Sequence, residues 1–205
     1  MTTSSRHYGL KDKAVSTVIL LFSLTLWGIV HSILASNFAK DMLGGARLYR
    51  LGYNLFAAVS FLPILYLMRT LPDRLVYQAP TPWSMVMFGG QIFAALMLLT
   101  AFLQTDSLSF VGLRQLFETE KRGALVTQGL YRVVRHPLYT FGLLFVWLTS
   151  TVSQNTLTVY IGATLYTLIG AYFEERKLLH EFGDGYAEYR RTTPMLIPWV
   201  RLGKQ

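Results

Sequence analysis

Long stretches of this chain carry no charged side chain. Asp, Glu, Lys and Arg are absent between positions 13 and 40, 50 and 69, 74 and 106, and 135 and 174. A helix needs about 20 apolar residues to cross ~30 Å of hydrocarbon. The first three stretches therefore predict membrane helices, over residues 14–36, 48–68 and 83–105. The fourth contains a small polar segment at 150–155, which predicts two shorter helices, 137–151 and 156–173, joined by a turn.

The segments between these helices differ in character. Residues 70–82 contain three prolines and predict a loop. Residues 106–135 form a polar stretch of mixed charge, and loops of this length are often functional. The tail 174–191 predicts an amphipathic helix that Gly183 and Gly185 break. The fold predicted is an all-α polytopic integral membrane protein with about five transmembrane helices, a C-terminal helical hairpin and a cytoplasmic tail helix, in a single domain spanning 1–205.

Composition and charge support a membrane location. Hydrophobic residues make up 52% of the chain and charged residues 15%, against about 25% charged residues in soluble domains. The net charge of +8 comes from basic residues that flank apolar segments, as they do in cytoplasmic membrane loops. Membrane lipid is therefore an expected partner and nucleic acid is not. The oligomeric state stays open.

The distribution of basic residues predicts an orientation. Five crossings place residues 37–50, 106–135 and the tail on one side of the membrane, and these segments hold most of the 19 lysines and arginines. That side is predicted to be cytoplasmic. The N-terminus then faces outward although it carries Arg6, Lys11 and Lys13. A different number of crossings would remove this conflict.

Two polar clusters adjoin the last two predicted helices. Residues 129–139 read Gly-Leu-Tyr-Arg-Val-Val-Arg-His-Pro-Leu-Tyr, and residues 174–189 begin with Glu-Glu-Arg. Because the hairpin 136–173 starts and ends at one membrane face, it brings Arg135 and His136 near Glu174 and Glu175. Ionisable groups that converge at a membrane boundary indicate a functional site. Taken singly, the same residues also fit a positive-inside anchor, a helix N-cap and a solvated helix start.

Several other chemistries lack the residues they need. The chain has no cysteine, so thiolate nucleophiles and thiolate metal sites are excluded. A nucleotide-binding glycine turn should follow a strand, whereas Phe182-Gly183-Asp184-Gly185 follows a predicted helix. No metal is predicted, because the histidines are scattered along the chain, at His7, His31, His136 and His180. Of these, His31 is interpreted as a packed or hydrogen-bonded residue of the first helix.

The order and spacing of the motifs resemble one enzyme superfamily. Gly-Leu-Tyr-Arg-x-x-Arg-His-Pro-x-Tyr, Glu-Glu-Arg, Phe-Gly-Asp-x-Tyr-x-x-Tyr and Pro-x-Leu-Ile-Pro are similar to the isoprenylcysteine carboxyl methyltransferase superfamily, which includes phospholipid methyltransferases. The resemblance covers Leu125–Pro198. His31-Ser32-x-Leu34-Ala35, Tyr49-Arg50-Leu51 and Gly112-Leu113-Arg114-Gln115 resemble a bacterial branch that includes methanethiol S-methyltransferases. The resemblance therefore implies a bacterial inner-membrane enzyme whose active site faces the cytoplasm.

The resemblance implies a methyltransferase that uses S-adenosyl-L-methionine and receives a small thiol or lipophilic acceptor from the bilayer. Residues 1–105 would supply the N-terminal helices and residues 106–205 the cofactor-binding and catalytic part. Catalysis is assigned to Arg135, Tyr139 and Glu175. The cofactor-binding residues implied are Leu125, Val126, Gly129, Leu130, Tyr131, Arg135, His136, Tyr139, Glu174, Glu175, Tyr186 and Tyr189. Carboxylates such as Glu174 and Glu175 would balance the sulfonium and ammonium, and Arg135 suits the cofactor carboxylate.

One departure from the resemblance bears on the acceptor. Carboxyl-methylating relatives carry an arginine a few residues before the glutamate pair, where it is thought to hold the substrate carboxylate. Here residues 169–173 read Ile-Gly-Ala-Tyr-Phe, without a cation. This favours methanethiol-type S-methylation over prenylcysteine carboxyl or phospholipid N-methylation. An NADPH-dependent membrane reductase of related fold and a non-catalytic membrane partner are the alternatives.

Overall fold

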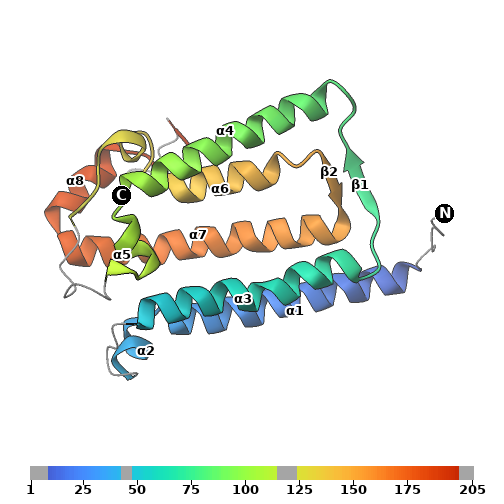
Figure 1. The fold of residues 1–205 in the computed structure, drawn as a ribbon, viewed down its shortest axis with the longest axis horizontal. Helices are drawn as coiled ribbons and strands as arrows, with labels where there is room; N and C mark the ends of the chain where they lie inside the picture. The colour runs from blue at the N-terminus through green and yellow to red at the C-terminus, as the bar shows by residue number, and fades with distance from the viewer. Residues whose placement is uncertain (1–8, 43–47, 115–123, 199–205) are drawn as a thin grey trace.

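Four long helices form the body of the protein. The computed structural model describes residues 9–42, 48–114 and 124–198 (Figure 1). Four helices are long and apolar enough to cross a membrane: α1 (Leu10–Leu34), α3 (Tyr49–Thr70), α4 (Trp83–Gln104) and α7 (Gln154–Phe182). The shorter helices are α2 (Asn37–Met42), α5 (Ser107–Val111), the 3-10 helix η2 (Gly129–Arg132), α6 (Pro137–Trp147) and α8 (Asp184–Thr192). The predicted all-α membrane fold is confirmed.

The fourth predicted crossing, over residues 137–151, corresponds to α6, which is short. Its 11 residues rise about 16 Å, roughly half of the ~30 Å hydrocarbon layer. The chain then enters strand β2 (Thr151–Ser153), which pairs antiparallel with β1 (Leu75–Gln78). The prediction of a simple loop over 70–82 therefore missed a strand. Pairing the strands satisfies backbone groups that apolar surroundings would leave without partners.

The end of α7 is a second difference from the sequence prediction. The predicted boundary between residues 173 and 174 does not exist, because α7 continues to Phe182 and the tail helix is reduced to α8. Glu, Arg, Lys and Leu are good helix formers, so the onset of charge after Phe173 does not end the helix. Gly183 ends it, with a φ of 54° that suits glycine. Gly185 lies inside α8, so the prediction that it breaks a helix is wrong.

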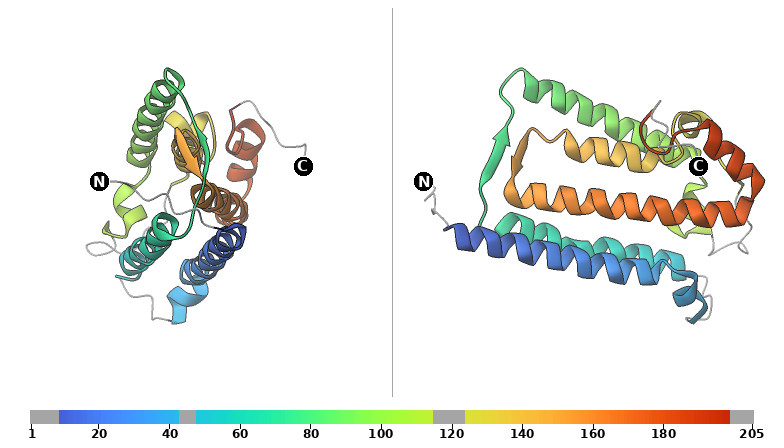
Figure 2. Two further views of the ribbon diagram at one scale, coloured as in Figure 1. Left: turned by 90° about the vertical axis from the view of Figure 1, so that its right-hand side faces the viewer. Right: turned by 180° about the vertical axis from the view of Figure 1, so that it is seen from behind.

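Helix α7 lies in the middle of the molecule. It packs against α1 and α3 on one side and α6 on the other, while α4 packs against α6 (Figures 1 and 2). The buried core between α1, α3 and α7 consists of Leu20, Ile64 and Val159. Large apolar side chains on the outward faces are exposed, among them Phe22 and Phe88 at 68% and 63%. Such exposure suits hydrocarbon as the surrounding solvent.

The two polar clusters identified in the sequence lie at one end of the bundle. Helices α2, α5 and α8 lie together there, while the β1–β2 pair and the described start of the chain lie at the other end (Figure 1). The chain therefore returns to this end after α1, after α4 and after α7. The hairpin predicted from the sequence forms, and it places the start of α6 beside the last turns of α7.

Candidate functional site

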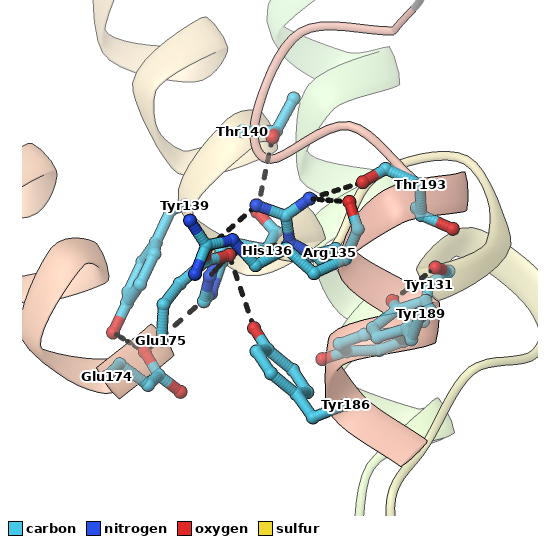
Figure 3. A network of polar contacts seen from close by, with 11 residues as sticks. Tyr131, Arg135, His136, Tyr139, Thr140, Glu174, Glu175, Tyr186, Tyr189 and Thr193 are labelled. Atoms are coloured by element: carbon cyan, nitrogen blue, oxygen red, sulfur yellow. Dashed lines mark hydrogen bonds and ion pairs between the residues drawn. The ribbon is translucent and has the colours of Figure 1, made fainter. Parts of the chain in front are cut away.

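Glu175 is the centre of a buried polar network. Its carboxylate accepts hydrogen bonds from Arg135 through Nε at 2.6 Å and Nη2 at 2.9 Å, which is a bidentate pair. The ring nitrogen Nε2 of His136 lies 3.2 Å from the same carboxylate, and the Tyr186 hydroxyl donates to it at 3.2 Å (Figure 3). The Arg135 and Glu175 side chains are only 8% and 9% exposed. The network therefore holds its charges out of water with their partners in place.

The remaining donors of Arg135 hold the tail against the start of α6. Its Nη1 donates to the carbonyl oxygens of Arg190, at 3.1 Å, and Thr193 (Figure 3). The backbone N–H groups of Arg135 and His136 donate to the carbonyls of Pro194 and Met195 at 2.9 and 3.1 Å. Residues 193–196, here called the tail strap, thus lie across the N-terminus of α6. Arg135 is committed to contacts within the protein.

Glu174 has a different environment from its neighbour Glu175. An α-helix turns about 100° per residue, so the two carboxylates leave α7 in different directions. The Glu174 side chain is 43% exposed. It accepts a hydrogen bond from the Tyr139 hydroxyl at 2.7 Å, and His136 Nδ1 lies 3.7 Å from it (Figure 3). Of the glutamate pair, Glu174 is the carboxylate that faces open space.

That open space is a large cavity, here called the first cavity. Its volume is about 840 Å³, within the range of about 300–1,000 Å³ that ligand pockets occupy. Charged residues in its lining include Arg50, Glu174 and Glu181, while α4 contributes an apolar wall that includes Leu98 and Phe102. The predicted site residues among its lining are Leu125, Val126, Tyr131, Arg135, His136, Tyr139, Glu174, Tyr186 and Tyr189.

Three predicted site residues do not line the first cavity. Glu175 lies behind its wall and supports it through Arg135 and Tyr186. Gly129 and Leu130 belong to η2, where the Leu130 N–H donates to Gln104 Oε1 at 2.8 Å. The structure thus brings the predicted clusters together, but it gives these three residues supporting positions.

Several lining residues were missed by the sequence prediction. Glu181 had a signal, because Glu174, Leu178 and Glu181 follow the i, i+4, i+7 spacing that places residues on one helix face. Arg50 stood only in a motif of the resemblance. The apolar lining from α4, such as Leu98, carried no signal, because its sequence does not separate a cavity wall from a lipid-facing surface.

Gly129 fits its position because it has no side chain. Its φ is +61°, and a Cβ built there would lie 2.4 Å from the side chain of Gln104. We expect Gly129→Ala to lower the free energy of unfolding by about 1–2 kcal/mol for the left-handed backbone alone, with further loss if Gln104 leaves Leu130. Chemical denaturation in detergent measures this. Gly142→Ala is the matched control, since nothing lies within 4 Å of its added Cβ, and equal stability of the two variants would contradict the expectation.

Three tyrosines at this end are held in their neutral form. Burial, and then the charge of Glu174, raises the pKa of Tyr131 to about 12. Burial also raises the pKa of Tyr186 and of Tyr189. Because the tyrosine pKa in an unfolded chain is about 10, the unfolded state loses these protons first as the pH rises. The stabilisation is therefore fully present below about pH 10 and is lost as the pH passes through the folded pKa.

The expected result is a fall in melting temperature above about pH 10. Thermal unfolding in detergent over a pH series measures it. Tyr131→Phe should make the fall shallower, because one of the shifted groups is removed while the backbone carbonyl of Tyr131 that accepts the Tyr189 hydroxyl remains. An identical pH dependence in the variant and the parent protein would contradict this account.

No group of three or more His, Asp or Glu side chains suited to holding a metal ion occurs among the residues that the structure describes. The absence of a metal stays a prediction from the sequence. Glu175 instead contacts Arg135 and His136, and Glu174 accepts a hydrogen bond from Tyr139.

Comparison with known proteins identifies the class. The family model of phospholipid methyltransferases matches residues 85–185. Methanethiol S-methyltransferase 2 of Bradyrhizobium diazoefficiens is 31% identical, covering 88% of this chain and 73% of its own. Methanethiol S-methyltransferase of Mycobacterium tuberculosis is 29% identical, covering 90% of this chain and 79% of its own. A protein-S-isoprenylcysteine O-methyltransferase of Schizosaccharomyces pombe is 36% identical over 37% of this chain and 34% of its own. No solved structure matches significantly.

The fold and the site, taken with these relatives, define an integral membrane methyltransferase. The matched region 85–185 includes most of α4, all of α6, the Arg135–His136 pair, the glutamate pair and most of the lining of the first cavity. The chain belongs to the membrane methyltransferase family that contains the phospholipid methyltransferases and the methanethiol S-methyltransferases. The resemblance predicted from the motifs is confirmed.

Proposed function

We propose that this protein transfers a methyl group from S-adenosyl-L-methionine to a small neutral thiol, with the cofactor in the first cavity. The observation that carries the proposal is the half-exposed carboxylate of Glu174, which lines an 840 Å³ cavity at one end of the bundle. A carboxylate in such a position is suited to a cationic ligand. The methyltransferase family of the chain supports the choice of cofactor.

The lining of the first cavity fits the chemical parts of this cofactor. Glu174 and Glu181 are anions that would face its sulfonium and ammonium groups. Arg50 is a cation on the same lining and would face its carboxylate. The apolar wall that includes Leu98 and Phe102 would accept the adenine ring. When bound, the cofactor supplies a methyl carbon that is already activated by the sulfonium, so the protein needs no nucleophile of its own.

The residues of the chain then have two kinds of role. Tyr139 fixes the Glu174 carboxylate through its 2.7 Å hydrogen bond, so that the charge is oriented before the ligand arrives. Arg135, Glu175 and the tail strap are positioning elements, because their polar groups are largely used within the protein. A bidentate grip of Arg135 on the cofactor carboxylate would require breaking its pair with Glu175. Alignment and exclusion of water supply much of the rate in such transfers.

A thiol acceptor is favoured over the other acceptors of the family. The relatives that cover most of this chain are named methanethiol S-methyltransferases. The segment 169–173, directly before the glutamate pair, carries no cation that could hold a substrate carboxylate. A neutral acceptor needs no such cation. We also infer that the site faces the cytoplasm of a bacterial inner membrane, because the segments at this end hold most of the lysines and arginines.

A methyl-transfer assay with radiolabelled cofactor tests the proposal. Purified protein is offered methanethiol, a prenylcysteine and a phospholipid in parallel. The expected result is label in the volatile thioether from methanethiol and little in the other two products. Label in the prenylcysteine ester or the phospholipid instead would contradict the thiol assignment, and no transfer by folded protein to any acceptor would contradict the proposed function.

A further inference from the structure

A second cavity lies between α1, α3 and α7. The residues that line it differ from those that line the first cavity. Its volume is about 420 Å³. None of the described residues that line it is charged, and most are apolar: Leu24, Trp27, His31, Ala57, Ala58, Phe61, Gly162, Ala163, Tyr166 and Thr167. A cavity of this kind suits a small neutral ligand. It is here called the acceptor cavity.

One histidine is held in a fixed orientation on its wall. His31 Nδ1 lies 2.7 Å from the Tyr166 hydroxyl, which lies 3.1 Å from Ser32 Oγ. The His31 ring stacks on Trp27 with centroids 4.9 Å apart and planes 13° from parallel. Trp27 is fixed in turn by its Nε1–H, which donates to Ser60 Oγ at 3.1 Å. The sequence interpretation of His31 as a hydrogen-bonded helix residue is correct, yet it leaves this degree of anchoring unexplained.

The hydrogen bonds allow a tautomer that leaves the other ring nitrogen ready to take a proton. If Nδ1–H donates to the Tyr166 oxygen, the Tyr166 hydroxyl can donate to Ser32 Oγ, and Nε2 then carries a lone pair. Among the described residues, the structure places no hydrogen-bond partner on Nε2. A neutral histidine fixed in this way on the wall of an apolar cavity has the arrangement of a general base.

Helices α3 and α7 both carry residues of the two cavities. The Tyr53 ring lies 5.9 Å from the His31 ring, and Arg50, about one turn earlier on α3, lines the first cavity. Tyr166 and Glu174 lie about two turns apart on α7, and Tyr139 donates to Glu174 at 2.7 Å. The His31–Tyr166 pair is therefore about two helical turns along α7 from the carboxylate assigned to the cofactor sulfonium.

We propose that the acceptor cavity binds the methyl acceptor, a small apolar thiol, and that His31 removes its proton. This inference rests on the proposed function. The acceptor sulfur forms a bond to the methyl carbon, while the sulfonium–methyl bond breaks and its electron pair stays on the departing thioether. The thiol proton passes to Nε2 of His31, and the resulting imidazolium is stabilised by the Tyr166 oxygen at Nδ1. The proton later leaves to water.

The lining also sets the range of acceptors. Without a charged side chain in its described lining, the acceptor cavity would take thiols such as methanethiol and short alkanethiols. It would exclude charged thiols such as glutathione, because their desolvation would not be compensated. Its 420 Å³ exceeds what a one-carbon thiol fills, so acceptors of a few carbons should react as well. Ala163→Leu would remove this room from the α7 side of the cavity.

Binding is tested first, without cofactor and without turnover. Trp27 stacks on His31 at the cavity wall, so titration with 1-butanethiol should produce a saturable change in tryptophan fluorescence. The change should disappear in Trp27→Phe and weaken at least tenfold in apparent affinity in Ala163→Leu. An equal response from the parent protein and Ala163→Leu would overturn the proposed location. S-adenosylhomocysteine binding, measured separately by calorimetry, tests the proposed function on its own.

The role of His31 is tested by its pH profile. We expect His31→Gln to lower kcat at neutral pH by about 100-fold or more, with S-adenosylhomocysteine affinity unchanged. The lost rate should return as the pH rises toward the thiol's own pKa, because the thiolate then needs no base. The exposed His180 provides the matched control, and His180→Gln should behave as the parent protein. A wild-type rate, or a low rate that does not recover at high pH, would overturn the general-base role, and if His31→Gln does not fold, the Ala163→Leu titration decides.

Discussion

Arg135→Ala is expected to lower the free energy of unfolding by about 3–5 kcal/mol and to abolish turnover. The change removes the bidentate partner of Glu175 and leaves that carboxylate buried, since its side chain is only 9% exposed. It also releases the carbonyls of Arg190 and Thr193, which Arg135 holds. Both the polar network and the tail strap should then lose their order.

Chemical denaturation in a mild detergent measures this effect, with methyl transfer assayed in parallel. The double variant Arg135→Met with Glu175→Met is the informative control, because it removes the pair without leaving an unpaired charge. It should recover much of the stability while remaining inactive, since the wall of the first cavity is altered. An Arg135→Ala protein as stable as the parent would contradict the structural role assigned to this pair.

Glu174→Gln is expected to have the opposite profile, with activity lost and stability kept. Its carboxylate is 43% exposed and lines the first cavity, so the amide replaces it without leaving a buried charge unpaired. Losing one charge-assisted contact of about 1.5–3 kcal/mol weakens binding roughly 10- to 150-fold. S-adenosylhomocysteine affinity should fall by that factor, and turnover should fall at least as far.

Calorimetry of the Glu174→Gln variant, with its melting temperature, separates these effects. Glu188→Gln is the matched control, because Glu188 lies on the exposed side of α8, where it pairs with Arg191, and is not part of the first cavity. Its cofactor affinity should equal that of the parent protein. If Glu174→Gln bound S-adenosylhomocysteine as tightly as the parent, Glu174 could not be the carboxylate that balances the cofactor charge.

The sequence was sufficient to predict which residues meet, because topology alone decides it. The charge-free stretches fix the helices, and a hairpin that leaves and returns at one face must bring Arg135 and His136 toward the glutamate pair. The length of α7 was harder to predict. The onset of charge at Glu174 marks a change of surroundings, whereas a helix ends where the backbone requires it, here at Gly183.

The partners within the site could not be predicted from residue types. Arg135 suits a cofactor carboxylate and a glutamate equally well. Only the folded structure shows that it binds Glu175 and the carbonyls of the tail. The tail strap contributes backbone carbonyls, which every residue possesses and which leave no signature in a sequence. Similarly, the contact between His31 and Tyr166 joins positions 135 residues apart, so the sequence around His31 does not indicate Tyr166 as its partner.

The central claim is that the first cavity binds a sulfonium nucleotide beside Glu174. Isothermal titration of purified, folded protein with S-adenosylhomocysteine tests it most directly. We predict saturable binding of one nucleotide per chain, weakened in Glu174→Gln and unchanged in Glu188→Gln. Absence of binding by the folded parent protein, or protection from thermal unfolding by NADPH alone, would contradict it.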